Sequence, residues 1–310
     1  SIVPIAFISH PSCLLHDVGA GHPERPARLN AIQDQLLSSG MDFALHRHDA
    51  PAAKREHLDR VHDPDYVTGI LTEAPYEGIL RLDSDTVMMP DTLEAALRAA
   101  GAVILGVDLV MGKQAGSAFC AVRPPGHHAE RHRAMGFCYF NNIAVGAAYA
   151  LDVHGLDRVA IIDFDVHHGN GTEDIFQNDP RVLFCSSFQH PFYPFTGHES
   201  ETDHVINIPL SAGAKGEQFR QQVEAHWLPA LESFQPQMVF ISAGFDAHAE
   251  DEMGHLRLRE ADYSWVTAQL KGIAEKYAEG RVVSALEGGY ALSALGRSVV
   301  AHLDALLGNR

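Results

Sequence analysis

Several features are scarce in this chain of 310 residues, and each scarcity narrows the class of protein. The four cysteines are scattered without a C-x-x-C pair, which indicates reduced thiols in a cytosol rather than a disulfide framework. No apolar run approaches the ~18 residues that a membrane-spanning helix requires. No repeat, linker or low-complexity segment divides the sequence. Residues 1–310 are therefore expected to form one domain.

Positive charge is scarce as well: 23 lysines and arginines face 40 acidic residues, which gives a formal net charge of -17 and a pI near 5.5. This balance argues against nucleic acid as a partner, and it would draw cationic substrates toward a cleft. The simpler interpretation is solubility alone. The apolar stretch at residues 2–8 is short and lacks a basic leader, so it predicts a first strand rather than a signal peptide. We expect a cytoplasmic protein with no membrane partner.

Short apolar stretches alternate with amphipathic ones along the chain. The apolar stretches predict strands at residues 2–8, 117–122, 158–164, 182–187, 204–209, 238–242 and 282–286. The amphipathic stretches predict helices at residues 26–39, 91–111, 141–154, 216–234, 260–279 and 292–307. This alternation predicts an α/β fold of three layers, in which helices cover both faces of a mainly parallel central sheet.

Charged and imidazole side chains occupy alternate positions where one predicted strand ends, at Asp163, Asp165 and His167. Because side chains alternate across an extended strand, these three point the same way. Two carboxylates are costly to bury there unless a cation compensates. Asp246 follows another strand, and with Asp165 and His167 it would complete a catalytic zinc site with one open position, which ferrous iron could also occupy. For Asp246 alone, the alternative is a helix cap or turn.

Two further loops at strand ends carry groups that can move protons or stabilise charge. His127 and His128 lie in a loop stiffened by two prolines; beside a metal, one can serve as general base and acid while the other supports charge. An isolated histidine pair is more often structural. Asp163 and Asn170 are available to fix their tautomers. Tyr290 follows two glycines and could donate to an oxyanion, or it could be an ordinary aromatic at a helix start.

Five segments resemble the histone deacetylase superfamily, which also contains acetylpolyamine amidohydrolases and acetoin utilisation proteins: residues 123–130, 136–142, 163–172, 243–246 and 287–290. The resemblance implies an arginase-like fold and zinc-dependent hydrolysis of N-acetyl amides. It implies that the zinc ligands are Asp165, His167 and Asp246. It also implies that His128 is the general base and acid and that His127 is its electrostatic partner. Asp163 would orient His127, and Tyr290 would be the oxyanion donor.

The resemblance also implies a structural potassium ion near Asp163 and Ser186, and an internal channel that handles acetate beside Arg25. For Arg25 the alternative is a surface arginine at a helix start. Asn170 stands where class I deacetylases carry an aspartate, so the chain looks like class II. A neutral amide stabilises an imidazolium less well than a carboxylate does. His128 is therefore expected to have a lower proton affinity than in class I relatives.

Predicted walls of the substrate channel are Gly136, Phe137, Phe192, Tyr193, Met253 and, at the rim, Asp85. The alternatives are a core aromatic for Phe137 and a solvated carboxylate in a turn for Asp85. Met253 stands seven residues after Asp246, where relatives that act on polyamines carry an acidic gatekeeper, so an acetylated lysine of a protein or peptide is favoured. Glu252 is adjacent, which keeps an acetylated polyamine or other small amine as the alternative. A catalytically silent scaffold would lack a ligand, a histidine or the tyrosine, and none is missing. A homo-oligomer is compatible with the sequence.

Overall fold

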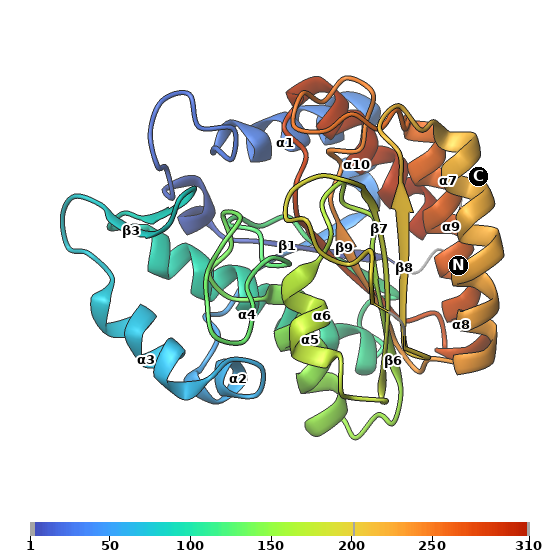
Figure 1. Ribbon diagram of the computed structural model, residues 1–310, viewed down its shortest axis with the longest axis horizontal. Helices are drawn as coiled ribbons and strands as arrows, with labels where there is room; N and C mark the ends of the chain where they lie inside the picture. Colours follow the sequence, from blue (N-terminus) through green and yellow to red (C-terminus); the bar gives the residue numbers. More distant parts are fainter. Residues whose placement is uncertain (1–3, 201, 309–310) are drawn as a thin grey trace.

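The computed structural model describes residues 4–200 and 202–308, and its centre is an eight-stranded sheet (Figure 1). The strands are β1 (Ile5–Ser9), β2 (Leu45–Asp49), β5 (Ser117–Cys120), β6 (Val159–Asp163), β7 (Val182–Gln189), β8 (Val205–Leu210), β9 (Val239–Ala243) and β10 (Val282–Leu286). They lie in the order β2-β1-β5-β10-β9-β6-β7-β8, and every neighbouring pair is parallel.

Helices cover both faces of this sheet (Figure 1). The α-helices of the described residues are α1 (Ala27–Ser39), α2 (Arg55–Asp59), α3 (Pro64–Glu73), α4 (Thr92–Met111), α5 (Asn142–Asp152), α6 (Asn170–Phe176), α7 (Gly216–Gln222), α8 (Leu228–Phe234), α9 (Glu260–Tyr277) and α10 (Leu292–Leu306). Helices α4 and α5 pack together on one face. On the other face, α10 packs against both α1 and α9. The prediction of a three-layer α/β fold with a parallel central sheet is confirmed.

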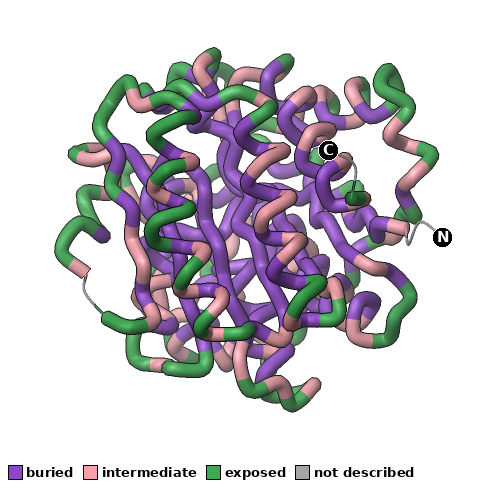
Figure 2. Tube along the Cα trace, turned by 90° about the vertical axis from the view of Figure 1, so that its right-hand side faces the viewer, coloured by how far each residue is buried: buried purple, intermediate pink, exposed green. Residues whose placement is uncertain are grey.

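The central strands are apolar almost throughout because helices exclude water from both of their faces. Every residue of β6, β9 and β10 is buried. Figure 2 shows these buried strands inside a shell whose exposed positions lie on the outer helix faces and the loops. Among residues 4–200 and 202–308, no helix combines the length and the hydrophobicity needed to cross a membrane.

The structure departs from the predicted elements where short or polar segments are involved. The helix predicted at residues 216–234 is interrupted by a π turn at 223–227, and Pro229 lacks the N–H that a continuous α-helix would use there. The missed elements are β2, α2, α3, α6 and a hairpin of β3 (Leu80–Asp83) and β4 (Thr86–Met88). Of the strand predicted at residues 2–8, positions 2 and 3 lie outside the described residues.

Candidate metal centre and active site

Four neighbouring strands lie at the middle of the sheet: β5, β10, β9 and β6. Each is followed by a loop that carries predicted site residues. The strands are far apart in the sequence, but parallel pairing places all their carboxyl ends at one edge. The loops that follow them therefore converge, and they bring together His127, His128, Asp165, Asp246 and Tyr290.

The side chains of Asp165, His167 and Asp246 form a buried cluster whose ligand atoms all lie within 4.8 Å of one another. His167 Nδ1 lies 3.3 Å from Asp165 Oδ1 and 3.3 Å from Asp246 Oδ2. Two carboxylates and one imidazole are the donors expected of a catalytic zinc site, and oxygen-rich sites also accept iron. This is the one such group of His, Cys, Asp or Glu side chains within the described part of the chain.

The carboxylate of Asp246 has an oxygen that is suited to bind a cation. Asp246 Oδ1 accepts the Val166 N–H at 2.9 Å, whereas Asp246 Oδ2 is buried and accepts no hydrogen bond. Burial raises the pKa of Asp246 to about 7, and the negative charge of Asp165 adds to the effect. A divalent cation would relieve both costs. At Gly288, a Cβ would lie 2.2 Å from Asp246 Oδ2, so only glycine lets the main chain pass this close.

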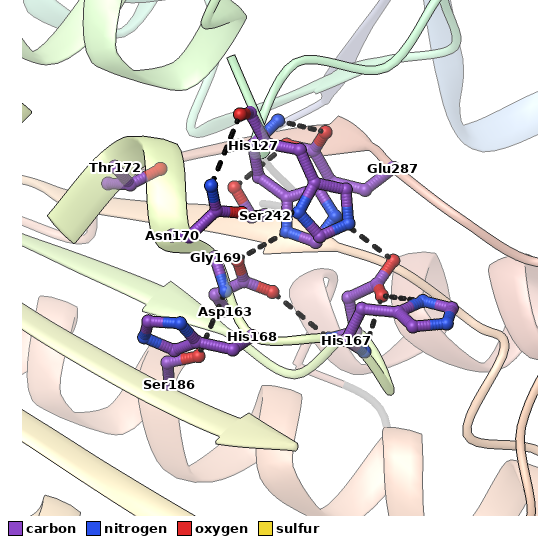
Figure 3. Close-up of polar contacts among 12 residues, drawn as sticks. His127, Asp163, His167, His168, Gly169, Asn170, Thr172, Ser186, Ser242 and Glu287 are labelled. Carbon is purple, nitrogen blue, oxygen red and sulfur yellow. Dashed lines mark hydrogen bonds and ion pairs between the residues drawn. The ribbon is translucent and has the colours of Figure 1, made fainter. Parts of the chain in front are cut away.

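His127 is held between two acidic groups (Figure 3). Its Nδ1 lies 2.7 Å from Asp163 Oδ2, and its main-chain N–H donates to Glu287 Oε1 at 3.1 Å. Burial disfavours a charged His127, but Asp163 and then Asp165 outweigh that cost and raise the pKa well above the ordinary value. Asp163 also neighbours Ser186 across the β6–β7 register, where potassium was predicted. No local pattern in the sequence predicts this contact of Glu287.

His128 has a different environment. Its Nδ1 lies 2.7 Å from Asn170 Oδ1, while Asn170 Nδ2 donates to Glu130 Oε2 at 2.7 Å. Because the amide oxygen can only accept, His128 carries its proton on Nδ1 and presents Nε2 as the free acceptor. Burial, followed by the charges of His127 and His167, lowers the pKa of His128 well below its ordinary value. The direction agrees with the expected low proton affinity, although burial is the larger cause.

A pocket of about 390 Å³ adjoins the cluster of Asp165, His167 and Asp246. All six residues predicted for the channel walls line it: Gly136, Phe137, Phe192, Tyr193, Met253 and Asp85. Thr86 Oγ1 in β4 accepts the Phe137 N–H at 3.0 Å, so the unpredicted hairpin ties Asp85 to this wall. Phe192 stacks on His167 with 5.3 Å between the ring centres. Glu252 and Tyr290 also line the pocket.

Arg25 is exposed just before α1, which agrees with a surface arginine at a helix start and contradicts a place beside an internal channel. The buried arginine is Arg28, three residues later and almost one helical turn on. Its guanidinium lies 4.8 Å from the centre of the Tyr290 ring and donates to the Gly289 and Glu287 carbonyls at 2.6 Å each. The spacing of a motif before a helix does not reveal which side of the helix faces inward.

Glu24 is the counter-charge for two buried guanidiniums, and we expect Glu24→Gln to lower the free energy of unfolding by about 3–5 kcal/mol. Glu24 accepts from Arg28 at 2.7 Å and from Arg123 at 2.7 Å. Although burial opposes the charge, Arg123 and Arg28 lower the pKa of Glu24 to about 2. The stabilisation is therefore complete above an ordinary glutamate pKa and disappears as the pH falls through about 2.

Urea unfolding at pH 7 and at decreasing pH measures this effect. The control is Glu94→Gln, which removes a half-exposed partner of Arg98 four residues along α4 and is expected to cost less than about 1 kcal/mol. A Glu24→Gln protein as stable as the control would contradict the prediction.

Fold and site together define an α/β protein with a metal-capable cluster at the carboxyl edge of a parallel sheet. The chain belongs to the histone deacetylase family, since residues 22–306 match the histone deacetylase domain. This confirms the resemblance seen in the sequence. The family supports a hydrolase that acts on amides.

Three known proteins show the extent of the similarity. The histone deacetylase-like amidohydrolase of Pseudomonas aeruginosa is 37% identical over 280 residues, which cover 87% of this chain and 73% of that protein. Polyamine deacetylase HDAC10 of Homo sapiens is 36% identical over 304 residues, covering 92% of this chain and 45% of that protein. The crystal structure of the HDA15 HD domain matches with a TM-score of 0.92 and 34% identity over 98% of this chain and 90% of that one.

Proposed function

We propose that this protein is a zinc-dependent, class II-like deacetylase that hydrolyses the acetyl amide of lysine side chains in proteins or peptides. The observation that carries the proposal is the buried, unbonded Asp246 Oδ2, which faces His167 beside the histidine pair and Tyr290 in one pocket. The net reaction adds water across the amide and yields acetate and a free amine.

The protein's own groups divide the proton transfers. His128, neutral with its Nε2 free, takes a proton from the attacking water and later delivers it to the leaving nitrogen. His127, kept protonated by Asp163, stabilises the negative charge that develops. Tyr290 has its hydroxyl protonated, because burial raises the pKa of Tyr290 well above the ordinary value, and it donates to the oxyanion.

Asp165, His167 and Asp246 would hold the metal. When bound, zinc supplies a Lewis acid that polarises the amide carbonyl and acidifies water; ferrous iron could supply the same chemistry. Asp163 and Ser186 would border a structural potassium ion. We expect one catalytic domain in residues 1–310.

A substrate panel on protein of known metal content tests the proposed function. Acetyl-lysine peptides, acetylspermidine and acetylputrescine are compared by kcat/KM, before and after chelation and after zinc is returned. We expect hydrolysis that is lost with the metal and restored with it, and the acetyl-lysine peptide is expected to give the highest kcat/KM. Metal-loaded protein that hydrolyses no acetylated amine would contradict the proposal.

Glu252 favours a second candidate, hydrolysis of acetylated polyamines. It lines the pocket next to Met253, and Asp85 lines the same pocket from the β3–β4 hairpin. Carboxylates placed there would attract the free ammonium group of a linear polyamine, whereas an acetyl-lysine side chain offers no such charge. The similarity to polyamine deacetylase HDAC10 agrees with this alternative.

The variant Glu252→Gln separates the two substrates. We expect KM for acetylspermidine and acetylputrescine to rise about threefold to tenfold, because one charge-assisted contact at a partly exposed site is lost. KM for an uncharged acetyl-lysine peptide should change less than about twofold. Glu224→Gln, which removes the same charge at an exposed position outside the pocket, is the control. Equal effects of Glu252→Gln on both substrates would exclude a role for this carboxylate in selectivity.

A further inference from the structure

Asp251 lies between two exposed residues, Glu250 and Glu252, yet its own carboxylate is buried and only 5% of the residue is exposed. Asp251 Oδ2 accepts the main-chain N–H of Tyr290 at 2.7 Å and that of Ala291 at 3.2 Å. Asp251 Oδ1 accepts the main-chain N–H of Met253 at 2.9 Å. One carboxylate thus receives three backbone donors from two separate loops.

The loop that carries Asp251 is fixed by other contacts. His248 is fully buried, its Nε2 lies 2.9 Å from Glu260 Oε2, and its Nδ1 accepts the Glu250 N–H at 3.0 Å. Arg297 of α10 then bridges Glu250 and Glu260. The Asp251 carboxylate is therefore presented from a frame joined to α9 and α10, and it does not have to create that frame.

The conformation of the segment that carries Tyr290 depends more on contacts with other parts of the chain than that of the Asp251 loop does. Gly289 has φ +123°, a conformation that favours glycine. Because glycine is conformationally permissive, it does little by itself to fix the path of the main chain. Gly288 N–H donates to Asp165 Oδ2 at 2.9 Å, and the Gly289 carbonyl accepts from Arg28. Asp251 supplies the contact to the peptide of Tyr290 itself, immediately before α10 begins. The position of the phenol in the pocket follows from the position of that peptide.

We propose that Asp251 is a positioning residue that fixes the main chain of Tyr290 and of Met253 together, so that one carboxylate sets both the oxyanion donor and a second residue of the pocket wall. This inference rests on the proposed function, in which Tyr290 donates to the developing oxyanion. Hydrogen bonds to an ionised acceptor are about twice as strong as neutral ones, which suits a single carboxylate that orders two loops. Misplacing a catalytic group by ~1 Å can lower a rate about 100-fold.

A double-mutant cycle tests the inference. Asp251→Asn keeps the size of the side chain but replaces one accepting oxygen with an NH₂ group, which cannot accept an N–H. In zinc-loaded parent protein we expect Asp251→Asn to lower kcat about 10- to 100-fold, with a smaller change in KM. In a Tyr290→Phe background the same substitution should lower kcat less than about twofold, because the hydroxyl that it misplaces is already absent. Melting temperature and zinc content are measured for every variant.

Asp262→Asn is the matched control, since Asp262 is also a buried carboxylate that accepts a backbone N–H, from Arg259 at 2.9 Å, and does not line the pocket. If Asp251→Asn does not fold, Ala291→Pro takes its place in the cycle. It deletes one donor to Asp251 at a residue whose φ of -79° suits proline. A severalfold fall in kcat that vanishes in the Tyr290→Phe background is then expected.

The possible failures are distinguishable. A loss of kcat from Asp251→Asn that is equally large with and without the Tyr290 hydroxyl would overturn the positioning role, and so would an unchanged kcat. If Tyr290→Phe leaves kcat unchanged, or zinc-loaded parent protein hydrolyses no acetylated amine, the proposed function fails and the inference fails with it.

Discussion

Asp246→Asn is expected to weaken zinc binding more than about 100-fold and to reduce hydrolysis of acetylated amines at least about 1,000-fold. The amide keeps an oxygen that can accept the Val166 N–H, so the loop retains its main-chain contact. The substitution removes the negative charge of Asp246 Oδ2, which is buried and accepts no hydrogen bond. The cluster is then left with one carboxylate, Asp165, and one imidazole, His167.

Metal content and thermal melting measure this effect independently of activity. Zinc that binds only the folded parent should raise its melting temperature as the concentration of free zinc increases, and this rise should be largely absent in Asp246→Asn. Asp262→Asn is again the control, because it removes a buried carboxylate away from the cluster. An Asp246→Asn protein that retains one zinc per chain and turns over substrate would show that Asp246 is not a ligand.

The ligand cluster could be anticipated in part from the sequence, because strand periodicity is a local property. Asp165 and His167 follow a buried strand at alternate positions, and the structure places both in the cluster. The proximity of Asp246 depends on something that no local pattern contains, namely that β9 lies beside β6 although β7 and β8 intervene in the chain. In the sequence, only the place of Asp246 after a predicted strand and the resemblance to the deacetylase superfamily indicate that it belongs to the cluster.

The unpredicted features share a different cause. Strand β2 lies at the edge of the sheet and has exposed polar positions, and the β3–β4 hairpin is short, so neither has a strong apolar period. Asp251 stands between two other acidic residues, and no local pattern indicates that its carboxylate is buried. Its burial follows from the packing of α9 and α10, which brings the Tyr290 peptide within reach. Long-range main-chain contacts of this kind leave no mark on residue spacing.

His128→Ala is expected to lower kcat for amide hydrolysis about 100- to 10,000-fold while zinc binding is retained, because His128 is not among the three clustered ligands. Zinc content and kcat are measured on the same samples. The matched control is His302→Asn, which removes another buried histidine whose pKa is low, about 3, and whose partners Thr267 and Ser284 lie outside the pocket. Its kcat per folded molecule should stay within about threefold of the parent.

The pH dependence gives a second, sign-specific test of His128. Burial and the neighbouring histidines lower the pKa of His128, so the base is neutral at pH 7 and loses function only when the pH falls far enough to protonate it. A bound divalent cation would lower the pKa further, in the same direction. The acidic limb of kcat/KM that belongs to His128 should therefore lie well below pH 6.5 in the parent and be absent from the residual activity of His128→Ala. Hydrolysis within a few-fold of the parent in zinc-loaded His128→Ala would require the proton to be moved by another group, and His127, held protonated by Asp163, is poorly suited to accept it.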